Sequence, residues 1–186
     1  MGDYLQDLAG ARTVVNGTLE AALHLQHGQL AGSGSIVGDV AVTGDGWIAP
    51  GNGDIGTVTI NGSLTLNAAG TLEYDFSDAA SDAIQVNGDL TLAGTLDLNE
   101  LSLISGGAHT YTLFTYTGSL TDSGLTVGLL PEHWLSATLD TSTFGQVDLH
   151  VAHNPEPTTL ALIAVGSVIL LRSGRRRKAR IGAGVP

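Results

Sequence analysis

Apolar and polar residues alternate along this chain, and the alternation is held across several turns. From residue 58 to residue 76 the even positions are Val, Ile, Gly, Leu, Leu, Ala, Gly, Leu, Tyr and Phe, whereas the odd positions are mostly Thr, Asn, Ser, Glu and Asp. Successive side chains of a strand point to opposite faces, so this segment has one apolar and one polar face. A helix of period 3.6 would mix the two sets, and the segment therefore predicts β-structure.

One phrase of this alternation recurs along the chain. Its copies are Val15-x-Gly17-x-Leu19, Ile36-x-Gly38-x-Val40-x-Val42, Ile60-x-Gly62-x-Leu64-x-Leu66 and Val86-x-Gly88-x-Leu90-x-Leu92. A repeat of this length is typical of stacked units that bury their apolar faces against one another. A glycine on the apolar face suits a corner where a side chain would not fit.

The repeat predicts an all-β fold in which residues 1–100 form the rungs of a parallel β-helix. An antiparallel β-sandwich, which also alternates, is the alternative. The residues expected to face inward are Ile60, Leu64, Leu66, Val86, Leu90 and Leu92.

The repeated pattern does not continue into residues 101–153. Residues 111–116 are a strand candidate, and residues 135–140 with 146–151 are expected to form a hairpin around residues 141–145. We predict that this segment is a C-terminal β cap, because the open end of a solenoid would otherwise expose unpaired strand edges.

The match to a known family is closest in residues 49–66, Ala-Pro-Gly-Asn-Gly-Asp-Ile-Gly-Thr-Val-Thr-Ile-Asn-Gly-Ser-Leu-Thr-Leu. Together with residues 81–86 and 92–98, this stretch resembles the repeat in passenger domains of autotransporters and related adhesin-like surface proteins. The resemblance covers about residues 30–120. It implies a right-handed parallel β-helix exposed outside the cell.

Charge is distributed very unevenly. Arg12 is the only Lys or Arg before residue 172, whereas every acidic residue except Glu156 lies before residue 154. An acidic body has little with which to neutralise phosphates, so nucleic acid is not an expected partner.

The C-terminal segment, residues 154–180, changes character abruptly. Pro155 and Pro157 fix their own backbone and bias Asn154 and Glu156 away from helix. Residues 158–171 carry no charge, and as a helix they would cover about 21 Å, less than the roughly 30 Å of a bilayer core. Length alone also allows a buried helix, but a following basic cluster can snorkel and fix orientation in a membrane. We predict a single short transmembrane α-helix at 158–171, oriented by Arg172, Arg175, Arg176, Arg177, Lys178 and Arg180.

The order of these three elements resembles the PEP-CTERM sorting signal. The matching residues are Pro155, Glu156 and Pro157, the apolar residues 160–171 and the basic cluster at 172–180, which a tail at 181–186 follows. The resemblance implies an exosortase-type transpeptidase as partner and a precursor in the inner membrane. It further implies delivery to the cell surface or extracellular matrix of a Gram-negative-type bacterium, with exopolysaccharide as a further partner. Residues 1–30 lack a basic n-region and an apolar h-region, so the chain is expected to be a fragment of a longer gene or to have a misassigned start.

No catalytic residue, cofactor or metal site is predicted. The chain has no cysteine. His24 and His27 have opposite strand parity and are expected to be an exposed pair rather than metal ligands. The Gly/Asp stretches at 44–46 and 51–54 contain fragments of calcium-binding turns but are expected to be plain turns.

The acidic residues on the polar face of the rungs are expected to be solvated charges; they are Glu73, Asp75, Asp89 and Asp97. The sequence thus favours a non-enzymatic surface or matrix protein. The alternative is a secreted polysaccharide-active β-helix enzyme, which needs two carboxylates at a set separation.

Overall fold

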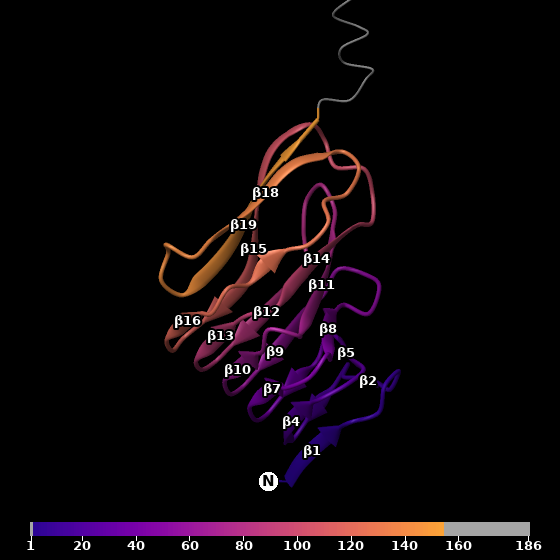
Figure 1. Ribbon diagram of the computed structural model, residues 1–186, viewed down its shortest axis with the longest axis vertical. Helices are drawn as coiled ribbons and strands as arrows, with labels where there is room; N and C mark the ends of the chain where they lie inside the picture. Colours follow the sequence, from indigo (N-terminus) through magenta and orange to yellow (C-terminus); the bar gives the residue numbers. More distant parts are fainter. Residues whose placement is uncertain (1, 155–186) are drawn as a thin grey trace, which may run out of the picture.

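The chain winds through three sheets in turn and adds one strand to each sheet per rung, as Figure 1 shows. The computed structural model describes residues 2–154. All neighbouring strands are parallel except in the cap at the C-terminal end. The predicted parallel β-helix is therefore confirmed over the antiparallel sandwich.

The bounds of the strands follow the winding. The first sheet contains β1 (Gly2–Gln6), β4 (Ala21–Leu25), β7 (Val40–Val42), β10 (Leu64–Leu66), β13 (Leu90–Leu92) and β16 (Leu120–Asp122). The second contains β2 (Arg12–Val14), β5 (Gln29–Gly32), β8 (Trp47–Pro50), β11 (Thr71–Phe76), β14 (Thr95–Glu100) and β17 (Thr126–Val127). The third contains β3 (Thr18–Leu19), β6 (Ser35–Ile36), β9 (Thr57–Ile60), β12 (Ala83–Val86), β15 (Gly107–Tyr116), β19 (Gln146–His153) and β18 (Trp134–Asp140).

Apolar side chains from equivalent positions stack in rows inside the helix. Leu64 pairs with Val40 on one side and Leu90 on the other, and Ile60 pairs with Val86. All six residues predicted to face inward are buried. Each rung has too few apolar side chains to form a core alone, so burial against the neighbouring rungs stabilises the stack.

The first copy of the phrase lies out of register with the sequence-based alignment. Leu19, not Val15, pairs with Ile36, and Leu23 pairs with Val40. The alignment on Gly17 was therefore wrong, and the first structural copy is Leu19-x-Ala21-x-Leu23-x-Leu25. Leu19 and Ile36 are 17 residues apart, whereas Ile36 and Ile60 are 24 apart, so the first repeat is shorter than the second. Ala21, and not Gly17, therefore occupies the position next to Gly38.

Glycine at one corner allows adjacent rungs to approach closely. A Cβ atom on Gly62 would lie 2.4 Å from the carbonyl oxygen of Gly38, and one on Gly88 would lie 2.5 Å from that of Gly62. A Cβ atom on Gly17 would meet nothing within 4 Å. The corner glycines are needed because the backbone of the preceding rung fills the space, not because of crowding in the core.

The parallel stack continues beyond the boundary drawn at residue 100. Leu120 pairs with Leu90 and Thr126 pairs with Thr95, so β16 and β17 begin a further turn. Above β15 the next strand is β19, which runs antiparallel to it, and β18 pairs antiparallel with β19. The predicted hairpin around residues 141–145 is confirmed, and it covers the end of the third sheet.

Candidate functional site

The predicted sorting and membrane residues lie outside the described part of the chain. This holds for Pro155, Glu156 and Pro157, for the predicted transmembrane helix at 158–171, and for the basic cluster at 172–180. Within residues 2–154 there is no helix long and apolar enough to cross a membrane. The candidate features that the structure describes are the outer faces of the rungs, a buried pair of acids and the cap.

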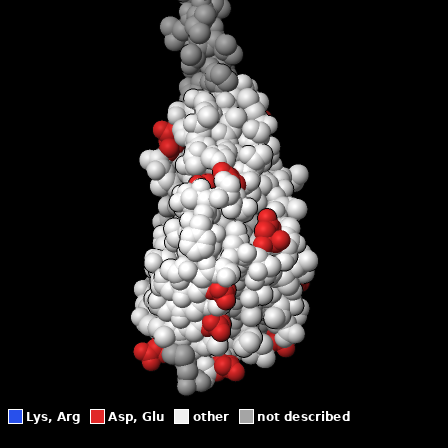
Figure 2. All heavy atoms as spheres, turned by 90° about the vertical axis from the view of Figure 1, so that its left-hand side faces the viewer, with Lys and Arg blue, Asp and Glu red and all other residues white. Residues whose placement is uncertain are grey.

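The outer faces are polar and regular. At one corner the Asp39 carboxylate accepts the Ser63 N–H at 2.8 Å, and the Asp89 carboxylate accepts the Ser119 N–H at 2.7 Å. Aspartate and serine alternate from rung to rung, so carboxylates do not stack on adjacent rungs there. Figure 2 shows the acidic side chains scattered over one face with uncharged surface between them.

A ladder of amides joins neighbouring rungs on the third sheet. The Asn61 side-chain amide donates to the Ser35 hydroxyl and the Asn87 amide donates to the Asn61 carbonyl oxygen, each at 2.8 Å. Each outward amide is thus held by the rung below it. The result is an ordered surface of hydrogen-bonding groups along the stack.

Exposed large apolar side chains lie only towards the two ends of the described chain, residues 2–154, and are absent from residues 15–100. At the N-terminal end they are Tyr4, Leu5, Leu8 and Val14. After residue 100 they are Leu101, Leu103, Leu129, Leu130, Leu135 and Phe144.

Among the carboxyl groups of residues 2–154, Asp82 has a strongly raised pKa. Its carboxylate accepts the Gly56 N–H at 2.7 Å and the Asp75 N–H at 2.9 Å. Burial, with smaller contributions from the charges of Asp75 and Glu73, raises the pKa of Asp82 to about 7, although the two backbone hydrogen bonds oppose the shift.

The Asp75–Asp82 pair is shielded from solvent. Asp82 is fully buried and Asp75 is 4% exposed, with its carboxylate accepting a hydrogen bond from the Asn99 amide. The expectation that Asp75 is solvated was therefore wrong, whereas Glu73, Asp89 and Asp97 are exposed as expected. The Asp82 carboxylate holds the backbone N–H groups of Gly56 and Asp75, and the Asp75 carboxylate holds the side-chain amide of Asn99. Neither carboxylate is accessible to a polysaccharide in this structure.

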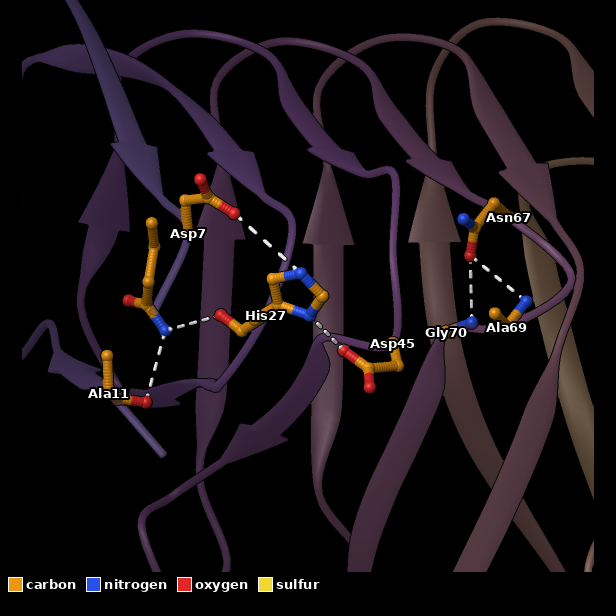
Figure 3. Close-up of polar contacts among 8 residues, drawn as sticks. Asp7, Ala11, His27, Asp45, Asn67, Ala69 and Gly70 are labelled. Carbon is orange, nitrogen blue, oxygen red and sulfur yellow. Dashed lines mark hydrogen bonds and ion pairs between the residues drawn. The ribbon is translucent and has the colours of Figure 1, made fainter. Parts of the chain in front are cut away.

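A histidine bridges two acids on neighbouring rungs near the N-terminal end (Figure 3). The His27 Nδ1 atom lies 2.5 Å from an Asp45 carboxylate oxygen, and Nε2 lies 3.7 Å from an Asp7 oxygen. His24 lies exposed on β4. Residues 2–154 contain no group of three or more His, Asp or Glu side chains placed to hold a metal ion.

The cap contains an aromatic cluster that the sequence analysis did not anticipate. The Trp134 indole N–H donates to Glu100 at 3.1 Å, and the ring centroid of His153 lies 4.7 Å from that of Trp134 and 5.2 Å from that of His109. His153 is 3% exposed, and neither of its ring nitrogens has a hydrogen-bond partner among the described residues. Burial and the charge of His109 lower the pKa of His153.

Comparison with known proteins bears on the resemblance to autotransporters. No protein-family model matches the chain. Over 117 aligned residues, 60% of this chain, it is 45% identical to the "Adhesin BmaC autotransporter" of Brucella suis biovar 1 (strain 1330). The chain is similar to part of a bacterial adhesin. It spans 3% of the length of that relative, and the predicted autotransporter-like character of the repeat is confirmed at this level.

Proposed function

We propose that this chain is part of a non-enzymatic, adhesin-like protein of the cell surface or extracellular matrix, with the β-helix as its outward-facing element. The observation that carries the proposal is the 45% identity to an autotransporter adhesin over 60% of the chain. The outer faces support it, because they offer an extended array of hydroxyl and amide groups rather than a shielded pocket. Among the carboxyl groups of residues 2–154, Asp82 has the strongly raised pKa, and it is buried and holds backbone N–H groups of the fold.

An adhesion assay tests this role. Beads coated with the full chain are washed over a monolayer of cultured epithelial cells and compared with uncoated beads. The matched variant carries Thr65→Lys and Thr91→Lys, which alter one outward row of the first sheet without touching the core. We expect the chain to increase bead retention and the variant to retain fewer beads. Coated and uncoated beads retained equally would contradict an adhesive role for these faces.

We propose further that residues 154–180 are a sorting signal that an exosortase-type transpeptidase cuts near Pro155–Pro157. The described chain ends at the first residue of this segment, Asn154, whose N–H donates to the carbonyl of His133 in the cap at 3.0 Å. A cut in the segment would release a folded, capped solenoid. The precursor would reside in the inner membrane through residues 158–171, oriented by the basic cluster, and the product would reach the surface or an exopolysaccharide matrix.

Cell fractionation of two variants tests the sorting signal in an exosortase-bearing host, with a functional signal peptide added. Replacing Pro155, Glu156 and Pro157 with Ala should leave the protein uncut in the inner membrane. Neutralising Arg175, Arg176, Arg177 and Lys178 should weaken retention during export and release uncut protein. Normal processing of the triple alanine variant would show that residues 155–157 are not recognised.

A further inference from the structure

The C-terminal end of the solenoid carries five exposed leucines, which we name the leucine end; they are Leu101, Leu103, Leu129, Leu130 and Leu135. Leu129 is 91% exposed and Leu135 is 64% exposed. The rungs between residues 15 and 100 expose no large apolar side chain in the described structure. Exposed apolar side chains therefore lie towards the ends of the described chain, and the leucine end is the group at the C-terminal end of the solenoid. An exposed apolar group of this kind indicates a contact surface.

The two loops that carry these leucines are joined at one residue. Glu100 accepts a hydrogen bond from the indole N–H of Trp134, the residue that follows the 128–133 loop. Glu100 also accepts the backbone N–H of Ile104, in the 101–106 loop, at 2.7 Å. Figure 1 shows both loops at the end of the molecule from which the C-terminal segment leaves. The leucine end and the exit of the chain thus occupy the same end of the solenoid.

The sequence limits how far this end lies from a membrane-inserted segment. Residue 154 is held against the 128–133 loop by its hydrogen bond to His133, and three residues separate it from the uncharged run that starts at Thr158. Four fully extended steps span at most about 14 Å. The polar headgroup layer of one leaflet is about 5–7 Å thick. If the run is inserted from Thr158 onwards, residue 154 lies at most about 7–9 Å beyond the outer edge of the headgroup layer, and the cap is held close to the membrane.

We infer that the leucine end rests on the lipid surface while the precursor is anchored by residues 158–171. The inference rests on the membrane anchoring in the proposed function. The lipid surface that fits is zwitterionic, because the body contains one cation, Arg12, and acids such as the exposed Glu132 lie beside the leucines. Leu129, Leu130 and Leu135 would enter the interface, and the stack would point away from the membrane.

A cysteine-free chain allows a direct test, because one introduced thiol can be labelled uniquely. A polarity-sensitive dye is attached to Leu129→Cys in the full chain, reconstituted into phosphatidylcholine vesicles. The matched control is Leu8→Cys, which is also strongly exposed but lies in the first rung at the opposite end. With vesicles, the dye at 129 should shift to the blue and lose at least half its intensity to lipids with a nitroxide near the headgroup. The dye at 8 should do neither.

A second variant separates the leucines from the tether. Adding Leu130→Ser and Leu135→Ser to Leu129→Cys should abolish the blue shift and leave vesicle flotation unchanged. A dye at 129 that responds like the dye at 8, in chains that float with the vesicles, would overturn the inference and leave anchoring intact. A blue shift that persists in the serine variant would also overturn it. Chains that do not float would overturn both the inference and the anchoring.

Discussion

The rungs and the cap are stabilised in different ways. In the rungs each inward residue stacks on its equivalent, as Leu64 does between Val40 and Leu90, so one kind of contact is repeated along the stack. In the cap the strands turn antiparallel and the contacts are unique, such as Trp134 with Glu100 and with His153. In the rungs, a short repeated sequence forms a long polar surface. In the cap, antiparallel strands end the parallel stack.

Breaking the repeated contact should have the largest effect. Leu64→Asp places a carboxylate in the middle of an apolar row with no cation near it, and the free energy of unfolding should fall by about 4 kcal/mol or more. Thr65→Asp is the matched control, because its side chain is exposed on the same strand. It should cost at most about 0.5 kcal/mol. Chemical denaturation measures both, and equal losses would contradict the inward row.

The corner glycines distinguish the first rung from the later ones. Gly62→Ala forces a Cβ atom against the backbone of Gly38 and should cost about 2–3 kcal/mol. Gly17→Ala meets open space and should cost less than about 0.5 kcal/mol. Thermal unfolding distinguishes the two. A large loss for Gly17→Ala would restore the alignment that placed this residue at the same corner.

Protonation of His153 in acid should destabilise the cap and leave the stability of the rungs unchanged. Its pKa lies below the unfolded value of about 6.5, so the folded state binds fewer protons, and stability is lost as the pH falls below that value. Hydrogen exchange should show β19 losing protection between pH 7 and pH 5 while β10 and β12 keep theirs.

Two variants test the assignment to this histidine. His153→Phe keeps a ring against Trp134 and should remove the loss of protection in acid. His150→Gln, at an exposed position of the same strand, should leave the loss in place. An acid response that survives His153→Phe would assign it to another group.

The smallest expected effect concerns the alternation of aspartate and serine on the outer corner. Ser63→Asp puts a carboxylate between Asp39 and Asp89 on the adjacent rungs and should cost about 1 kcal/mol. Salt screens exposed charges, so the loss should shrink between low and high ionic strength. A loss that does not change with salt would mean that Ser63 acts through its hydrogen bonds alone.

The predictions from the sequence were correct mainly where the chain repeats. The inward positions and the parallel pairing were predictable because each stacked position recurs with the same parity. A fifth copy, Tyr116-x-Gly118-x-Leu120-x-Asp122, was missed because Tyr and Asp stand where the other copies have aliphatic residues. The alternation also gave a wrong prediction for Asp75. Its position in the pattern predicts an exposed side chain, but the residue is buried and its N–H donates to Asp82.

The cap could be predicted only as a hairpin. The pairing of Trp134 with Glu100 and the burial of His153 join residues that share no period, so no pattern in the chain places them together. The buried acids have the same character, since Asp82 reaches Gly56 across the rung boundary. Local alternation specifies which face a residue occupies, but it does not specify which loop covers it.

Mass spectrometry of the surface-exposed protein tests the proposal that a sorting signal delivers this β-helix to the cell surface. The protein is produced with an added signal peptide in an exosortase-bearing host, shaved from intact cells and analysed for its C-terminal peptide. We predict that this peptide ends near Pro155–Pro157. A C-terminal peptide that continues through Arg175 would contradict the claim and identify residues 158–180 as a permanent membrane anchor.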